Sequence, residues 1–179
     1  MASTIANDIG SLARAFWEIC LLKRAPQDLP ASQFLLGCTL LSYVLLGMAI
    51  NLIGFGFAEA CTLSVAMTAL LLISIRLLLR IRGYDARLQQ TATAMMGISI
   101  VLFVPAVILR YWFHLIELNG SESNLAGYIW VALFVWQLFI SANIFRHALG
   151  MRLFGGFIVS IAYALLEFRV MFFVHQSFE

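Results

Sequence analysis

The stretch FLLGCTLLSYVLLGMAINLIGFGF, residues 34–57, contains no Asp, Glu, Lys, Arg or His. A helix needs about 20 predominantly apolar residues to cross the hydrocarbon core of a bilayer, so this stretch predicts a membrane span. The composition of the whole chain agrees, because 63% of its 179 residues are hydrophobic, only 11% are charged and the mean hydropathy is +0.96. A soluble protein of this size could not bury so much apolar surface, so we expect an integral membrane protein.

Four further segments are long and apolar enough to span a membrane. They cover residues 60–79, 91–115, 127–145 and 153–174. The connections between the five spans are too short to hold a second hydrophobic core, so residues 1–179 are expected to form a single membrane domain. The predicted fold is therefore an all-α bundle of five transmembrane helices.

An additional helix is predicted before the first span, over residues 8–24. Apolar side chains recur at helical spacing from Ile9 to Cys20, whereas Arg14 and Glu18 share the opposite side. A helix with one apolar and one charged face is expected to lie along a membrane surface rather than across it. The sequence thus adds an amphipathic, interfacial helix to the N-terminus of the bundle.

The segment LLKRAPQDLPAS, residues 21–32, connects this helix to the first span. Pro26 is expected to end the preceding helix, because the residue before a proline is disfavoured in the α conformation. The segment is then a hinge that turns the chain from along the membrane to across it. The alternative is a cytoplasmic docking surface for a partner, formed by the polar side chains of Lys23, Arg24, Gln27 and Asp28.

The charges of the connections alternate along the chain. Arginine or lysine occurs before the first span, between the second and third spans, and between the fourth and fifth, whereas the other two connections carry glutamate and no base. Loops on the cytoplasmic side of a membrane carry an excess of Lys and Arg. We therefore expect a cytoplasmic N-terminus and an external C-terminus, which requires an odd number of spans.

Several polar or ionisable residues fall within the predicted spans, where they are costly and usually face protein or water. Their positions predict an intramembrane polar site formed by Asn51, Arg110, His114, Glu167 and Arg169. Arg110 and Glu167 are expected at matching depths, which leaves three interpretations open. They form a neutralising pair that locks the bundle, or a substrate, lipid-headgroup or proton site, or a contact between subunits.

The last span carries a stripe of small residues. Gly156, Ser160 and Ala164 recur every four residues, a spacing that allows another helix to pack closely. Glu167 continues this face and is expected to point into the bundle. Arg169 is turned about 200° from Glu167, at ~100° per residue, so it should extend outward or meet a partner subunit.

The sequence contains no pattern typical of catalysis or of a bound cofactor. There is no nucleophile–base grouping, glycine-rich phosphate loop or HExxH motif, and the cysteines lack metal-ligand spacing. His114 and His175 fall near the same predicted surface, but no haem-attachment motif or paired-histidine pattern accompanies them. With a net charge of only +2, nucleic-acid binding is also unexpected. We therefore expect a protein that is not an enzyme and that uses no metal or cofactor.

The element PQDLP, Pro26 to Pro30, stands directly before the first of five closely spaced spans. This layout is similar to the Yip1 family of small membrane proteins, and to uncharacterised proteobacterial inner-membrane proteins that carry the same element. The resemblance lies mainly in topology, since the DLYGP-type element of eukaryotic Yip1 proteins is absent. It implies a non-catalytic adaptor or organiser, here in a bacterial inner membrane, and it transfers no functional residue.

Two functions follow from these observations. The first is a non-enzymatic accessory subunit, assembly factor or organiser of a larger membrane complex, whose partners are the lipid bilayer and other membrane subunits or a second copy. The alternative is a small transporter or lipid-handling protein that uses the intramembrane polar residues beside Pro105, which is expected to break the third span. A water-filled cavity that reaches Glu167 would favour the alternative, and a dry, paired site would favour the first.

Overall fold

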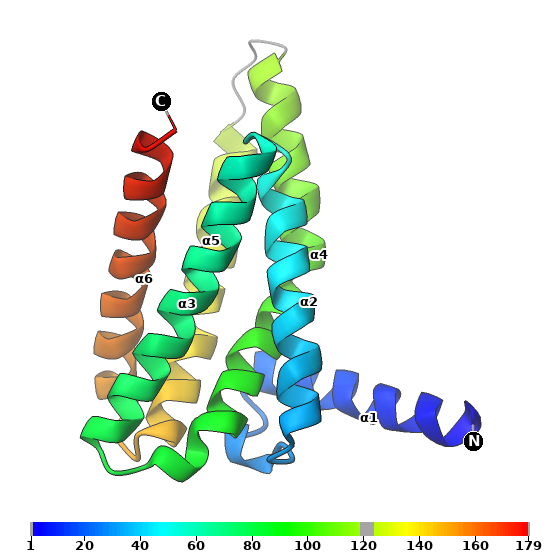
Figure 1. Cartoon of the computed structure of the whole chain (residues 1–179), viewed down its shortest axis with the longest axis vertical. Coiled ribbons are helices and arrows are strands. Elements are labelled where there is room, and N and C mark those ends of the chain that lie inside the picture. Colours follow the sequence, from blue (N-terminus) through cyan, green and yellow to red (C-terminus); the bar gives the residue numbers. More distant parts are fainter. Residues whose placement is uncertain (1, 119–123, 179) are drawn as a thin grey trace.

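The computed structural model describes residues 2–118 and 124–178, and this part of the chain is helical, with no β-strand (Figure 1). Its elements, in chain order, are α1 (Ala2–Cys20), η1 (Pro26–Asp28), α2 (Gln33–Asn51), α3 (Phe57–Ile81), η2 (Asp85–Arg87), α4 (Leu88–Leu118), α5 (Asn124–Ala148) and α6 (Leu153–Gln176), where η marks a 3-10 helix.

The prediction of five helices that could span a membrane is confirmed. Helices α2 to α6 are each long and apolar enough to cross a bilayer. The helices α3, α4, α5 and α6 contain the predicted spans and extend beyond them at one or both ends. Helix α4 also continues through Pro105, so the expected break in the third span does not occur.

The first predicted span, residues 34–57, is too long, because α2 already ends at Asn51. A tight apolar turn follows, in which the Phe55 amide donates to the Asn51 carbonyl (3.1 Å) and Gly56 is the N-cap of α3. Glycine is a poor helix former, and Gly54 and Gly56 lie within this short turn. The chain therefore reverses at residues that a hydropathy count includes in one continuous span.

Helices α2 to α6 form a ring in which each contacts the next, in the order α2, α4, α5, α6, α3 and back to α2. Helices α3 and α4 also touch each other inside the ring. As a result α4 and α6 are separated by α5 on one side of the ring. This order decides which polar residues of the spans can meet.

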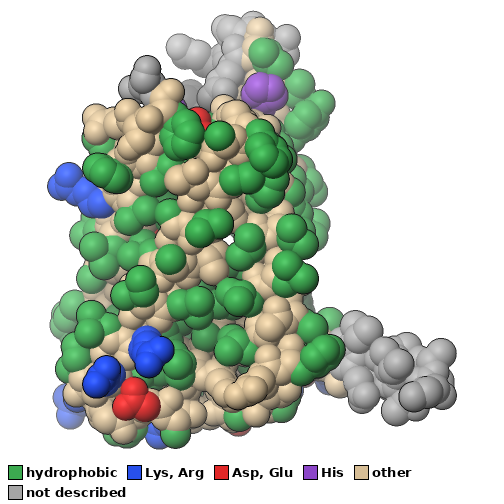
Figure 2. Space-filling view, in the orientation of Figure 1, with side chains coloured by type: hydrophobic (Ala, Val, Ile, Leu, Met, Phe, Trp, Pro, Cys, Tyr) green, Lys and Arg blue, Asp and Glu red, His purple; other side chains and the backbone are tan. Residues whose placement is uncertain are grey.

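The connections that contain arginine lie at one end of the ring, the lower end in Figure 1, which we call the basic end. Most of the Lys and Arg side chains visible in Figure 2 gather there, whereas the middle of that face is apolar. The α2–α3 turn and the C-terminal end of α6 lie at the opposite end. The bundle thus has two ends of different charge.

The tightest packing is in the half of the bundle near the basic end. Apolar side chains from α3, α4 and α5 that are at most 4% exposed form a core layer there: Leu71, Ile75, Leu79, Ala92, Ala94, Met95, Met96, Ile98, Ile140, Ile144, Phe145 and Ala148. Helix α2, in contrast, buries only Thr39. The helices are therefore held together mainly by this layer and less by contacts in the other half.

Close packing of α5 against α6 depends on small residues. Gly156 lies so near α5 that a Cβ atom there would collide with the Ala142 carbonyl oxygen. Farther along α6, Ser160 Oγ donates to the Leu138 carbonyl (3.2 Å), and Ala164 is buried. The stripe of small residues predicted from the sequence therefore faces α5.

The C-terminal half of α1 is buried in the bundle. Phe16 is 8% exposed, and its ring lies directly over Gly97 of α4, where an added Cβ would collide with it. Trp136 Nε1 of α5 donates to the Cys20 carbonyl (3.2 Å), and burial raises the pKa of the Cys20 thiol to about 11. The N-terminal half of α1 projects away from the bundle near the basic end (Figure 1).

The range predicted for this helix, residues 8–24, is shifted, because the helix runs from Ala2 to Cys20. Leu22 adopts the left-handed conformation with φ 60°, and the amides of Leu22 and Lys23 close the last turn with hydrogen bonds of 2.9 Å. This is a common motif at the C-terminal end of a helix. The left-handed conformation is roughly 1–2 kcal/mol less favourable for a residue with a Cβ atom, such as Leu22, than for glycine. The left-handed residue Leu22 and these hydrogen bonds therefore end the helix, several residues before Pro26.

Candidate functional site

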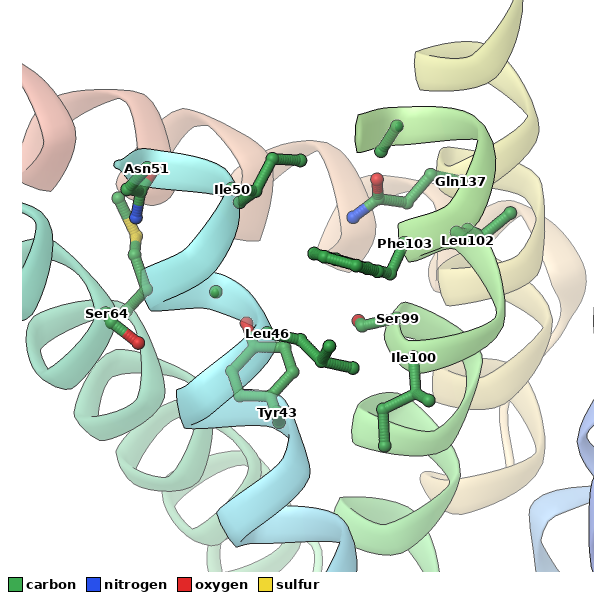
Figure 3. Close-up of a pocket in the computed structure, with 13 residues that line it drawn as sticks. Tyr43, Leu46, Ile50, Asn51, Ser64, Ser99, Ile100, Leu102, Phe103 and Gln137 are labelled. Atoms are coloured by element: carbon green, nitrogen blue, oxygen red, sulfur yellow. The ribbon is translucent and has the colours of Figure 1, made fainter. Parts of the chain in front are cut away.

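A chamber of about 220 Å³ lies among α2, α3, α4 and α5 (Figure 3). Polar side chains from all four helices line it, namely Tyr43, Asn51, Ser64, Ser99 and Gln137, and its other walls are apolar. At ~30 Å³ per molecule, the chamber could hold about seven waters. The bundle thus contains a hollow with polar walls above its core layer.

Gln137 shows why the bundle is hollow at this level. It lies on the same face of α5 as Ser141 and Ile144, which are 5% and 0% exposed. Gln137 is nevertheless exposed, because the side chain faces the chamber instead of protein atoms, as Figure 3 shows. One face of α5 therefore passes from the core layer into an open space within two turns.

Two side-chain amides in the chamber are without partners in the described part of the chain. Ser64 Oγ donates to the Val44 carbonyl (2.6 Å) and Ser99 Oγ to the Met95 carbonyl (3.0 Å), so both hydroxyls are satisfied within the protein. Asn51 and Gln137 make no such side-chain hydrogen bond there. Their amides are consequently available to water or to a ligand.

A second cavity of about 70 Å³, which we call the α4–α5 cleft, adjoins the chamber. Its walls are the apolar side chains of Leu102, Ala106, Trp130, Leu133 and Phe134, and Gln137 also lines it. Three of these residues, Leu102, Ala106 and Gln137, line the chamber as well. The two cavities therefore meet at Gln137.

Glu167 lines a third and smaller gap, between α5 and α6. Ser141, Ser160 and Tyr163 line the same gap, and so does Gln137. With a volume of about 10 Å³, the gap is at the lower limit of the space that one water needs. Glu167 therefore points into the bundle, as the helical spacing predicts, and Gln137 lines both its gap and the chamber.

Arg110 and Glu167 form no ion pair within the part of the chain that the structure describes. The guanidinium of Arg110 instead packs over the backbone of Gly54 and lies 5.3 Å from the centre of the Phe55 ring. A cation over an aromatic face is favourable, but this contact leaves the N–H donors of the guanidinium without an acceptor among the described residues. Arg110 is thus a cation without a carboxylate partner among the residues that the structure describes.

The other two residues of the predicted polar site lie apart from the chamber lining. His114 is partly buried on α4, one turn beyond Arg110. Arg169 is exposed, on a face of α6 turned away from Glu167. The structure therefore places Asn51 in the chamber, Arg110 near it and Glu167 in an adjoining gap, and it does not join all five residues.

A partly buried contact between a carboxylate and an imidazole joins the start of α3 to the end of α6. Glu59 Oε1 lies 2.7 Å from His175 Nδ1, and the Phe55 ring lies 5.5 Å from the His175 ring. Sequence reasoning assigned no partner to Glu59 and did not single out Gln137. A signal for Gln137 does exist, since it is a lone amide in the middle of the apolar run VALFVWQLFIS.

We expect that replacing Glu59 with alanine lowers the free energy of unfolding by roughly 1–2 kcal/mol, because a partly buried hydrogen bond between Glu59 and His175 is lost. Glu59→Gln keeps an acceptor and should cost less. Glu18→Ala, which removes the exposed Arg14–Glu18 pair, is the control and should cost about 0–1 kcal/mol. Chemical unfolding in detergent measures all three, and equal losses for the two alanine variants would contradict the prediction.

The four residues predicted as a docking surface lie near the basic end. The Gln27 side chain donates to the His147 carbonyl of α5 (2.7 Å). Asp28 Oδ2 accepts from the Ala25 amide (3.0 Å), Arg24 lies 3.7 Å from Glu18, and Lys23 is exposed. Three of the four side chains are therefore engaged within the chain itself.

The surrounding residues fasten the PQDLP element to the bundle. Gln90 Nε2 of α4 donates to the carbonyls of Gln27 (3.1 Å) and Leu29 (2.9 Å), and the Leu29 side chain is buried. Arg87 Nη1 donates to the carbonyls of His147 and Ala148, both at 3.1 Å. The PQDLP element thus connects α1 to the bundle and is held by hydrogen bonds at the basic ends of α4 and α5.

The described residues contain no group of three His, Cys, Asp or Glu side chains that could hold a metal ion. Comparison with protein-family models, with curated proteins and with solved structures gives no significant match. The chamber, the α4–α5 cleft and the unpaired Arg110 are therefore the features from which a function can be proposed.

Proposed function

We propose that the protein binds a small polar molecule or a lipid headgroup in the chamber, as a small transporter or lipid-handling protein. The observation that carries the proposal is the open volume of about 220 Å³ into which the free amides of Asn51 and Gln137 face. Polar groups inside a membrane are costly unless protein, water or a ligand satisfies them. A bundle that served only to hold its own helices together would be more stable with apolar residues at these positions.

The position of the charged residues supports the same proposal. A structural lock would neutralise Arg110 with Glu167, yet the two belong to α4 and α6, which α5 separates in the ring. Each remains close to a cavity instead: Glu167 beside Gln137, and Arg110 at the turn that begins with Asn51. Unpaired ionisable groups beside an intramembrane cavity are typical of substrate or proton pathways.

A different observation favours the second candidate, an accessory subunit or organiser of a larger membrane complex. The N-terminal half of α1 extends beyond the bundle, where it is free to meet another membrane subunit or a second copy (Figure 1). The Yip1-like layout belongs with this candidate. Purification in mild detergent, followed by identification of the proteins that accompany the chain, would support it if a defined partner is found.

We place the basic end in the cytoplasm of a bacterial cell, with the bundle in the inner membrane, because arginine-rich loops remain on the cytoplasmic side. The exposed Arg14 on α1 then lies near the anionic headgroups of that surface, as expected of an interfacial helix. The α2–α3 turn and the Asn51 side of the chamber face the external side.

The test of the proposed function is access of water to the chamber. In a chain whose native cysteines are replaced by alanine, we expect Gln137→Cys to react with a charged, membrane-impermeant thiol reagent at least roughly 10-fold faster than Val135→Cys. Val135 is exposed on the opposite face of α5, so it is the matched control for a position in contact with lipid. A thiol in lipid stays protonated and unreactive, whereas one in water ionises. Equal, slow reaction at both positions would overturn the proposal.

A further inference from the structure

We infer that the ligand is an anionic, lipid-like amphiphile, whose headgroup occupies the chamber near Arg110 and whose chain lies in the α4–α5 cleft. This inference rests on the proposed function, because it requires that the chamber accepts a ligand. It adds the chemical class of that ligand, names Arg110 as the cation that attracts it, and names the α4–α5 cleft as the place of its apolar part.

The first support is the continuity of the chamber, which has five polar side chains in its lining, with a cleft whose only amide is that of Gln137. The chamber and the α4–α5 cleft share Leu102, Ala106 and Gln137, so a molecule can occupy both at once. Beyond Gln137 the cleft offers only apolar walls, including Trp130 and Phe134. A wholly polar ligand would have no favourable contact in the cleft, whereas an alkyl chain would gain from each methylene buried there.

The second support is the charge at the chamber. Arg110 follows Phe103 and Ala106 on the same face of α4, and both of those residues line the chamber. Its guanidinium rests on Gly54 and Phe55, directly after the chamber residue Asn51. Of the carboxylates that the structure describes at this end, Glu59 contacts His175, and Glu167 lines the separate gap beside Gln137. An anion at the Asn51 side of the chamber would therefore lie near a cation that has no carboxylate partner among the described residues.

The third support is the level of Arg110 in the bundle. It contacts the α2–α3 turn, where α2 ends after 19 residues, a length close to the ~30 Å of a hydrocarbon core. This places Arg110 at the boundary of the hydrocarbon, where lipid headgroups lie. An arginine fork suits the paired oxygens of a phosphate or carboxylate better than any other side chain does.

The inference predicts binding that depends on headgroup charge. We expect the purified protein in mild detergent to bind short-chain phosphatidic acid roughly 10-fold more tightly than phosphatidylcholine with the same chains, measured by native mass spectrometry. Arg110→Gln should abolish this preference, and Arg110→Lys should keep part of it. Arg169→Gln is the matched control, because it removes an exposed arginine of α6 and should change the preference less than about twofold.

Two further measurements test the role of the ligand's alkyl chain. Inorganic phosphate alone should bind at least roughly 10-fold more weakly than the lipid, because it leaves the cleft empty. Leu133→Trp, which fills the cleft, should weaken binding of both lipids while Gln137→Cys still reacts with the aqueous reagent. Equal losses for Arg110→Gln and Arg169→Gln, no preference between the headgroups, or phosphate binding as tight as lipid binding would each overturn the inference. If any of these occurs while Gln137→Cys remains reactive, the chamber is open to water as the proposed function requires, and only the inferred ligand class is wrong.

Discussion

Replacing Gly156 with alanine is expected to destabilise the bundle by about 3 kcal/mol, near the upper end for overpacking by a single methyl group. The added Cβ would collide with the Ala142 carbonyl oxygen and would lie 3.2 Å from the Arg146 amide nitrogen. Both atoms belong to the backbone of α5, so the strain is relieved only if α5 and α6 move apart. A change of this size lowers the unfolding temperature of a chain this long by roughly 6–12 °C, which thermal unfolding in detergent measures.

Two glycines provide matched controls for this experiment. At Gly37 of α2 no atom lies within 4 Å of an added Cβ, so Gly37→Ala should be neutral or stabilising by up to about 1 kcal/mol through helix propensity. At Gly155 the added Cβ would meet the flexible side chain of Met151, which can move away at little cost. Losses at Gly37 or Gly155 as large as that at Gly156 would show that close contact between α5 and α6 is not the cause.

Replacing Gly97 with leucine is expected to make Cys20 react with maleimide at least about 100-fold faster than in the unmodified chain. The leucine would displace the Phe16 ring and with it the C-terminal end of α1, so that Cys20 would no longer be buried against the bundle. While α1 is docked, Cys20 is 0% exposed, and a rise of its pKa from 9.0 to about 11 lowers the thiolate fraction about 100-fold at neutral pH. The rate is measured after Cys38 and Cys61 are replaced by alanine.

The control for this experiment is Gly10→Leu, in α1 itself, where no atom lies within 4 Å of an added Cβ. It should leave Cys20 as unreactive as before.

The raised pKa of Cys20 also predicts that the stability of the docked α1 depends on pH, because docking favours the neutral thiol. Its contribution is fully present below about pH 9 and is lost as the pH rises through about 11. Rapid labelling of Cys20 in the unmodified chain at neutral pH would contradict the docked position of α1.

Hydropathy and helical spacing were sufficient to predict the five apolar helices, because length and side-chain polarity decide which segments suit a bilayer. The small residues Gly156, Ser160 and Ala164 also indicated a closely packed face, and Glu167 indicated its direction. The end of α2 at Asn51 was not predictable in this way. The turn that follows is as apolar as the helix, so the reversal depends on backbone conformation and on contact between Gly54 and Arg110.

The candidate site depended on information that no single helix carries. Matching depth suggested that Arg110 and Glu167 meet, but depth does not tell which helices are neighbours, and the ring places α5 between them. The amphipathic pattern of α1 likewise does not distinguish an apolar face covered by lipid from one covered by α4, as happens at Phe16 and Gly97. The chamber is a space left between helices, and its sequence signals were Asn51, which was predicted in the polar site, and the lone Gln137, which was not singled out.

The core layer near the basic end gives the chamber a floor. Side chains such as Ile75, Met96 and Ile144 close the ring there at 1%, 0% and 0% exposure, while the polar walls begin just beyond them. In this conformation the buried core layer closes the bundle between the chamber and the basic end. Opening a path through the floor would expose these side chains to water at a cost of roughly 25 cal/mol per Å². If the chamber binds a ligand as proposed, the ligand would not pass through the core layer, and its passage across the membrane would need a second arrangement of the helices.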